Sequence, residues 1–394
     1  MRCRIIVPHP QPARTQGRFC GDNTVMNDVR SHDPRPPGVD PSCWARITAG
    51  LLQRTHLLEA MAQRVYAPTS AATTIALPSA LTQGHGAYLP QLHALTPAGG
   101  RWLGLMTFDI APDAQGQWWV LGQCSRAALP DPHAAPPAFW SNALSAWLQR
   151  WQSVIPIVGS EAPLWVALLP FSADRNRPLA TPEWAPWGLQ PARAADFRVR
   201  DQRLWLETPE GLRPVHGLIN LQGDDVLDPV EQNCDPNAGI AGLFDVVRQG
   251  HVVLLNAPGL VFLDTPAWLG FLPSLTQSLL QEPLRMPSIT SWWCGEPSVT
   301  SIALKRGQDH WIVPTYPDDG LRLHFAPQSV DALTDVQRAA WAQRMRLDGA
   351  AHTVQSRWRG QAPWRVLTLI DPDGHGTALP LGPTDAWPQP APWI

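Results

Sequence analysis

Apolar runs of strand length alternate with helical repeats of apolar residues from Ser42 to about residue 370, and this alternation limits the possible folds more than any other feature. Ser42 is placed to cap a helix in which apolar residues recur at helical spacing up to Met61. Further helices are predicted at 139–155, 236–248, 265–282 and 334–346, that at 236–248 with Asp235 as its N-cap. Strands that alternate with helices favour an α/β fold over an all-α fold.

Two of the predicted strand pairs are hairpins. The segments 102–110 and 117–121 flank a turn-rich connection, and 197–200 and 203–207 flank a two-residue turn. Single apolar strands are predicted at 164–169, 215–221, 252–255, 310–313 and 365–370. Because 394 residues exceed the size at which one core keeps growing, we expect two lobes around a cleft.

Charge and cysteine usage exclude several classes of function. A formal net charge of -3 predicts no strong attraction to nucleic acid or to an anionic membrane, and no apolar run is long enough to span a bilayer. The six cysteines are scattered without zinc-ligand spacing, so they are interpreted as reduced thiols of a cytoplasmic protein.

The ends of the chain differ in composition from its middle. Residues 1–40 have no apolar periodicity and are predicted to be a disordered leader, while 383–394 form a tail rich in proline and tryptophan. The folded part is therefore predicted to lie between residues 41 and 382.

Acidic and amide side chains gather between Gly223 and Asn237, directly after a predicted strand. Magnesium prefers oxygen ligands, usually carboxylates together with phosphate and water. On extended backbone, Glu231 and Asn233 would face the same side. The segment therefore predicts a Mg²⁺ site formed by Asp225, Asp228, Glu231 and Asn233. Spacing alone favours the alternative, a solvated acidic loop that leads into a helix cap.

Other motifs with known chemistry are missing from the sequence. There is no Walker A motif, no G-x-G-x-x-G motif and no G-x-S-x-G nucleophile elbow. A hydrolase that uses one of the scattered histidines stays open only as a distant alternative, because catalytic triads assemble in space.

Six segments, in order along the chain, resemble the circularly permuted ATP-grasp type 2 family. They occur in family order over a stretch of some 270 residues, and the combination of Trp-Trp-Cys-Gly with Asp-Pro-x-Glu is the most specific part. The segments are 50–58, 116–121, 197–215, 228–243, 247–257 and 284–295. The resemblance implies a circularly permuted ATP-grasp core over 41–330, with a divergent C-terminal part of that core over 331–382.

The resemblance also implies a function and its cofactors. Such enzymes are ATP-dependent carboxylate–amine ligases that form an acylphosphate and let an amine displace phosphate, using ATP and Mg²⁺. Asn256 and Gly259 are the residues of the implied nucleotide-binding turn, and the substrate would be a small molecule or a peptide.

The cationic residues of the family pattern are largely missing. Its paired arginines align with Asn220 and Leu221, its phosphate-contacting lysine aligns with Val313, and a further arginine aligns roughly with Cys124. Lys305 is the only lysine of the chain and lies outside the matching strand. Because phosphoryl transfer depends on cations that stabilise charge, these losses predict weakened or lost ATP turnover.

Two questions follow from the missing cations. One is whether an arginine from elsewhere, such as Arg306 or Arg365, replaces them. The other is whether the chain is instead a non-catalytic interaction or regulatory partner of an active ATP-grasp paralogue or of a helical neighbour protein.

Overall fold

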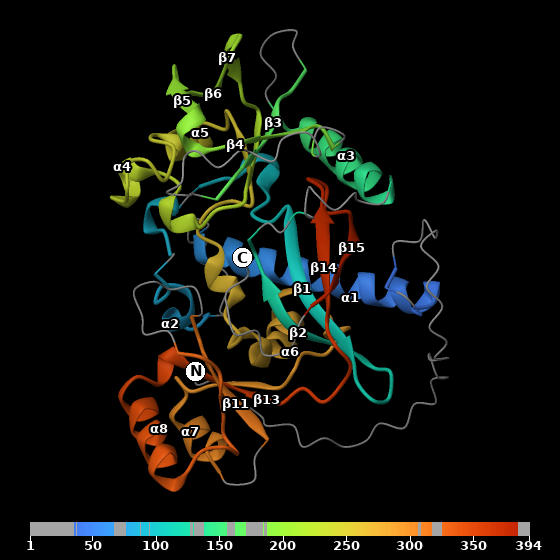
Figure 1. Ribbon diagram of the computed structural model, residues 1–394, viewed down its shortest axis with the longest axis vertical. Helices are drawn as coiled ribbons and strands as arrows, with labels where there is room; N and C mark the ends of the chain where they lie inside the picture. The colour runs from blue at the N-terminus through green and yellow to red at the C-terminus, as the bar shows by residue number, and fades with distance from the viewer. Residues whose placement is uncertain are drawn as a thin grey trace.

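The computed structural model describes most of the chain between residues 35 and 384. The described residues are 35–36, 38–66, 76–86, 88–93, 95–126, 129, 138–155, 162–170, 184, 187–305, 309–316 and 325–384. Nearly all of the predicted leader and most of the predicted tail lie outside them. The mixed α/β fold is confirmed, and Figure 1 shows it as a central sheet with further sheets and helices on both ends.

A long helix, α1 (Pro41–Tyr66), begins at a cap that the sequence did not predict. Asp40 accepts a hydrogen bond from the amide of Cys43 through Oδ1 at 2.9 Å, and Pro41 takes the first helical position. Ser42 is therefore not the cap; its hydroxyl lies inside the first turn and donates to the same Asp40 oxygen. The buried face of α1 includes Ile47, Leu51, Leu58 and Met61.

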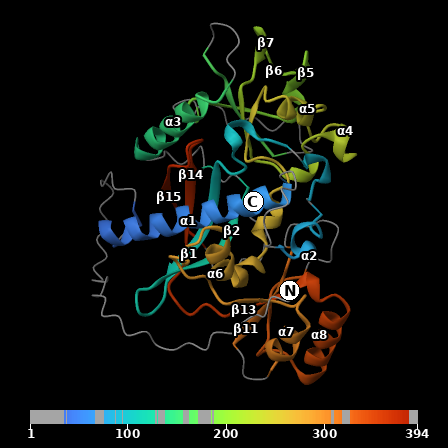
Figure 2. The same ribbon diagram turned by 180° about the vertical axis from the view of Figure 1, so that it is seen from behind.

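The central sheet has the antiparallel strand order β15-β14-β1-β2. Its strands are β1 (Leu105–Pro112), β2 (Trp118–Cys124), β14 (Trp364–Ile370) and β15 (Gly376–Pro383). Helix α1 crosses one face of this sheet, and Figure 2 shows the same packing from behind. Because β14 pairs with β1, residues 364–369 lie in the same sheet as residues 105–110.

A second sheet is parallel, with the order β4-β3-β8-β9. It is formed by β3 (Trp165–Leu168), β4 (Leu189–Ala192), β8 (Gly217–Asn220) and β9 (Val253–Leu255). An apolar cluster joins this sheet to helix α3 (Ala138–Gln152) and to the central sheet. The carboxyl ends of β8 and β9 lie at one edge, which is where open parallel sheets usually bind ligands.

Three short antiparallel strands follow the parallel sheet in space. They are β5 (Phe197–Arg200), β6 (Arg203–Thr208) and β7 (Gly211–Pro214), and they confirm the predicted hairpin. Its two-residue turn holds Asp201 and Gln202 at positive φ. Positive φ at both central residues is the twist that a two-residue hairpin needs.

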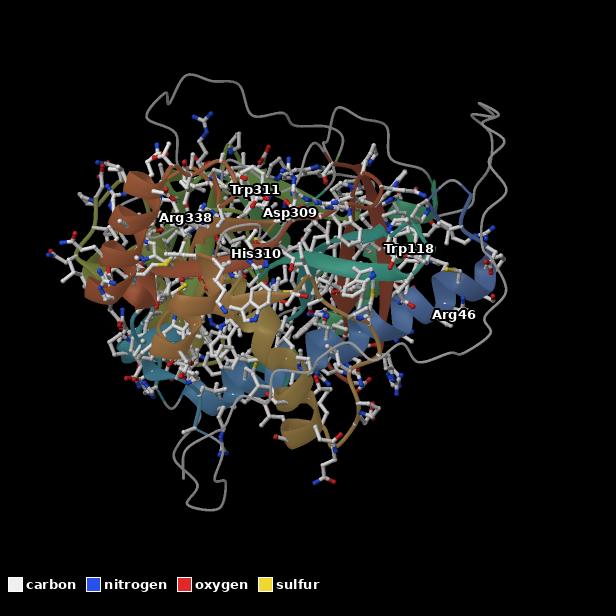
Figure 3. The ribbon with its side chains drawn as sticks, turned by 90° about the horizontal axis from the view of Figure 1, so that it is seen from below. Arg46, Trp118, Asp309, His310, Trp311 and Arg338 are labelled. Carbon is white, nitrogen blue, oxygen red and sulfur yellow. The ribbon has the colours of Figure 1, made fainter. Side chains whose placement is uncertain are left out.

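At the opposite end of the molecule lies a small sheet with the order β10-β13-β11-β12. Its strands are β10 (Ser291–Trp293), β11 (His310–Pro314), β12 (Gln328–Ser329) and β13 (His352–Ser356), packed with α7 (Pro297–Ala303) and α8 (Asp335–Leu347). Arg338 of α8 ties these parts together by donating to the carbonyls of Leu304 and Val330. Figure 3 shows Arg338 beside the β11 segment, with Arg46 of α1 and Trp118 of β2 farther away.

The remaining helices are short, apart from α6 (Trp268–Leu279). They are α2 (Ser79–Thr82), α4 (Pro229–Gln232) and α5 (Leu243–Arg248). The predicted helix at 236–248 is wrong in its first half, because the Asp235 side chain accepts from Asn237 in a local turn and Gly242 has a φ of +80°. Within the described part of the chain, no helix is long and apolar enough to cross a membrane.

Candidate functional site

Asp228, one of the predicted magnesium ligands, is a completely buried carboxylate that holds two helix N-termini. Its Oδ1 accepts from the amides of Val230 and Gly242, both at 3.1 Å, and its Oδ2 accepts from the amide of Phe244 at 3.0 Å. These are the unpaired donors at the starts of α4 and α5. The geometry assigns Asp228 to capping and joining these helices.

Glu231 is bound to an arginine. Its two oxygens each lie 2.5 Å from a guanidinium nitrogen of Arg248, which makes a bidentate pair. Arg248 also donates to Asp245 and to the carbonyl of Gln91, so the pair links α4, α5 and the 88–93 segment.

Asp225 and Asn233 are both exposed to solvent. Asn233 ends α4 with a φ of +52°, so the extended backbone expected between Glu231 and Asn233 is not present, since Pro229–Gln232 is a helical turn. Among the described residues, the carboxylates of Asp225, Asp228 and Glu231 are not brought together into one group that could hold an ion. The predicted magnesium set does not fit Mg²⁺ in this arrangement.

Asn256 lies where the parallel sheet meets the central sheet. Its Oδ1 accepts from the amides of Gly104 (2.8 Å) and Leu105 (3.0 Å), and its Nδ2 donates to the carbonyls of Leu105 (2.8 Å) and Ser125 (2.5 Å). A primary amide has two donor hydrogens and two acceptor lone pairs, so all its capacity is used. Asn256 therefore positions the turn that follows β9.

Gly259 forms the turn itself, with a φ of +84°. Its carbonyl accepts a hydrogen bond from the hydroxyl of Tyr66 at 2.8 Å. A Cβ at this position would lie 2.5 Å from that hydroxyl oxygen, so the turn requires glycine for both backbone conformation and space.

Asp224 is a buried acid that the sequence did not single out, and it faces this turn. Its Oδ2 accepts from the amides of Gly259 (2.8 Å) and Leu260 (3.2 Å), while its Oδ1 accepts from Nδ2 of Asn220 (3.0 Å). Burial raises the pKa of Asp224 to about 6, against the opposing effects of the two amides and of the Arg126 charge. The signal in the sequence was its place directly after a strand, but Asp225 shared it.

A small cavity of about 10 Å³ opens beside this carboxylate, with room for about one water molecule. Nucleotide-sized ligands occupy pockets of several hundred cubic ångströms. The cavity is lined by Ser125, Arg126, Asn220, Asp224, Asn256, Ala257 and Leu260. In this arrangement it does not fit ATP.

The cavity joins several positions that the family pattern had marked. Asn220 stands where the pattern has an arginine, and Ser125 follows Cys124, which aligns roughly with a further arginine of the pattern. Cys124 itself points to Asp264, with Sγ 3.5 Å from Oδ2. The guanidinium at the cavity comes from Arg126, two residues beyond Cys124.

Of the two arginines named as replacements, Arg365 does not supply that charge. Arg365 pairs with the buried Asp109 of β1, with Nε 3.1 Å from Oδ1. Arg306 lies outside the described residues. Val313, at the position of the family lysine, is buried in β11, and Lys305 is exposed after α7.

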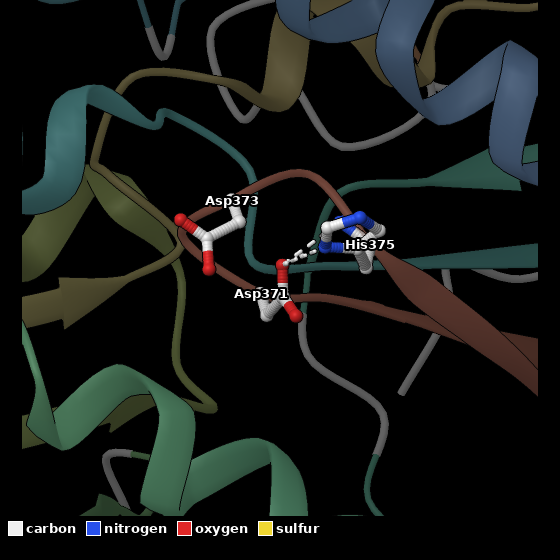
Figure 4. A group of neighbouring side chains, drawn as sticks. All are labelled: Asp371, Asp373 and His375. Carbon is white, nitrogen blue, oxygen red and sulfur yellow. Dashed lines mark hydrogen bonds and ion pairs between the residues drawn. The ribbon is translucent and has the colours of Figure 1, made fainter.

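A different group of side chains in the described residues could bring three ligand atoms near one ion. Asp371, Asp373 and His375 follow β14 in the turn before β15, as Figure 4 shows. Asp371 already pairs with Arg150 and accepts the amide of His375 at 2.8 Å. The Arg150 charge disfavours a cation there.

Comparison with known families decides the relationship of the chain. The model of "Circularly permuted ATP-grasp type 2" matches residues 36–129 and 186–365, which is more than half of the sequence. The chain belongs to the circularly permuted ATP-grasp type 2 family. The resemblance drawn from the sequence motifs is thereby confirmed.

Curated relatives of this ATP-grasp chain are named as uncharacterized proteins. A protein of Mycobacterium tuberculosis is 27% identical over 305 residues, which covers 72% of this chain and 34% of that protein. A Synechocystis protein is 22% identical and covers 93% of this chain and 78% of its own length. The chain thus spans about a third of the length of this Mycobacterium tuberculosis protein.

A solved structure of a glutathione synthetase-like effector from Globodera pallida, in its apo form, is also similar. The match covers 86% of this chain and 83% of that chain, with 9% sequence identity and a TM-score of 0.47. A likeness this low carries no inference about the chain.

Proposed function

We propose that this chain is a ligase-like ATP-grasp protein by descent whose ATP turnover is weakened or lost. The observation that carries the proposal is the use of Asn220: its amide donates to the buried Asp224, at a position where the family pattern has a cation. Arg126 also lines the cavity, but its positive charge is offset by the nearby carboxylate of Asp224.

The energetic reason lies in phosphoryl transfer. Charge spreads over the phosphoryl oxygens in the transition state, and positioned cations stabilise it. The loss of one such cation costs about 3 kcal/mol, which is roughly a hundredfold in rate. Several losses together, at Asn220, Leu221 and Val313, support a turnover near zero.

The acidic residues give no compensation. Asp228 is used by three backbone amides and Glu231 by Arg248, so a magnesium ion that bridged these carboxylates to a nucleotide would have to break both arrangements. Use of ATP and Mg²⁺ is implied by the family, and in this chain it would require these side chains to leave their present partners.

An ADP-release assay tests the proposal. The purified 394-residue chain and the variants Arg126→Gln and Arg346→Gln are each incubated with ATP and Mg²⁺. Arg346 is an exposed arginine of α8, so its variant is a matched charge control. We expect ADP formation at the level of the enzyme-free blank in all three samples. ADP formation by the wild type that Arg126→Gln abolishes and Arg346→Gln leaves intact would show that the site is catalytic.

The second candidate is a non-catalytic partner of an active ATP-grasp paralogue. It is favoured by the Mycobacterium tuberculosis protein of 27% identity, in which the region similar to this chain is about a third of a longer polypeptide. Co-expression with an intact paralogue, followed by size-exclusion chromatography, should then give a stable complex. Separate elution of both proteins at micromolar concentration would count against this candidate.

A further inference from the structure

The turn after β9 has the geometry of an anion-binding concavity. Gly259 is left-handed, with a φ of +84°, and Leu260 is right-handed, with φ and ψ of -94° and -5°. Successive backbone N–H groups in such a pair of conformations converge on one point and bind oxyanions. The point is occupied here by Oδ2 of Asp224, which both amides contact.

One further donor and one positive charge lie near the same carboxylate. Asn220 donates from Nδ2 to Oδ1, and the positive charge of Arg126 acts on Asp224 across the cavity that both residues line. Two backbone amides, a side-chain amide and a guanidinium form a donor set suited to a tetrahedral oxyanion.

The segment that carries Asp224 is independent of the turn it fills. It is a short 3-10 turn (Asp224–Val226) after β8, whereas Gly259 and Leu260 follow β9. The turn is fixed without Asp224, because Asn256 anchors its start and Tyr66 holds the Gly259 carbonyl. The donors should therefore stay in place when the carboxylate is removed.

We propose that the Gly259–Leu260 turn is an oxyanion site of the phosphate class, which the protein keeps filled with its own Asp224 carboxylate. A phosphate group must displace Asp224 to reach these donors. The inference does not depend on ATP turnover, since it concerns binding at the turn alone.

Removal of the carboxylate tests the proposal, with inorganic phosphate as the probe. Calorimetric titration compares the wild type with Asp224→Ala, with the isosteric Asp224→Asn, and with Asp225→Ala, which removes an equal charge from the exposed neighbour. We expect Asp224→Ala to bind phosphate at least tenfold more tightly than the wild type and Asp225→Ala. Addition of Arg126→Gln to Asp224→Ala should remove the gain.

A folding defect in Asp224→Ala does not hide the result. Asp224→Asn keeps the shape but removes the negative charge, so it holds the turn's N–H donors less strongly and should also gain phosphate affinity. Phosphate should raise the melting temperature of both variants, because a ligand that binds only the folded state stabilises it. If neither variant gains affinity or thermal stability beyond Asp225→Ala, the proposal is wrong.

The source of the oxyanion is found by the same titration. ADP that binds Asp224→Ala at least tenfold more tightly than phosphate identifies a nucleotide phosphate as the ligand. Equal affinities identify free phosphate. Either result supports the oxyanion site. The titration measures binding, whereas the ADP-release assay measures turnover, so the two proposals can fail separately.

Discussion

The side chains of Asp224 and Asn256 lie at the junction of the sheets. Together they make seven hydrogen bonds to groups from four other segments of the chain. Sequence motifs led to Asn256 and Gly259 through the family pattern, and both lie at the cavity or at the turn beside it. They did not lead to Asp224, because neighbouring acids in one loop are distinguished only by which of them faces inward.

Asn256→Ala should destabilise the fold strongly. The amides of Gly104 and Leu105 and the carbonyl of Ser125 would lose their partner in a buried place. Each buried group left unpaired costs about 1–3 kcal/mol, so we expect a loss of about 3 kcal/mol or more in the free energy of unfolding. Urea denaturation measures it, and a loss below about 1 kcal/mol would contradict this role of Asn256.

The Asp224 carboxyl should make stability depend on pH in a defined direction. Its pKa is about 6 when folded, against an ordinary value of 3.8. The folded protein therefore holds more protons than the unfolded chain between these values, and its free energy of unfolding falls as pH rises through that range. The fall is at most about 3 kcal/mol, since one pKa unit corresponds to about 1.4 kcal/mol.

The non-titrating variant Asp224→Asn isolates this effect from the other acids. Urea denaturation at several pH values between 4 and 7 should show the wild type losing stability relative to Asp224→Asn as pH rises to about 6, with no further change above it. A relative gain by the wild type over that range would reverse the sign and contradict the burial argument.

At the scale of elements, long helices were predicted better than their starts. Helix α1 and helix α8 lie close to their predicted ranges, although Asp40 and not Ser42 caps α1. The start of α5 was missed because its capping acid, Asp228, lies fourteen residues before Gly242. Local pattern rules cannot detect a cap that comes from another turn.

Six strands were also missed, namely β4, β7, β10, β12, β13 and β15, and the last two show different physical reasons. The segment of β13 alternates polar and apolar residues only weakly, and β15 contains prolines. Proline is tolerated in β15 because this strand lies at the edge of the central sheet. The segments of β13 and β15 become strands because they pair with β11 and β14, respectively. Such pairing cannot be recognised from one short segment of sequence.

Asp228→Ala should loosen α4 and α5 together. Three backbone amides would lose their acceptor, two of them at the start of α5. A helix cap alone contributes about 1 kcal/mol, and buried amides raise the total, so we expect a loss of roughly 3 kcal/mol.

The exposed Asp225→Ala is its control, expected within about 0.5 kcal/mol of the wild type. Thermal and urea denaturation of both variants decide the matter. Equal stability of the two variants would show that Asp228 is not the acid that joins the helices.

At the scale of the whole molecule, the chain belongs to the family, while the positions that align with its cations hold Asn220, Leu221 and Val313. The central sheet pairs residues 105–110 with residues 364–369, and the family model matches residues 36–129 and 186–365. Motif order was sufficient to predict the family. It could not show that the acidic residues bind the protein's own amides and arginine.

Asp224 fills the turn after β9, and the cations of the family pattern are replaced at Asn220, Leu221 and Val313. Calorimetric titration of the wild type with ATP and Mg²⁺ tests most directly whether the protein has lost ATP binding for this reason. We expect no saturable heat at ATP concentrations up to the millimolar range. Saturable binding with a dissociation constant in the low micromolar range, followed by ADP in the recovered sample, would contradict it.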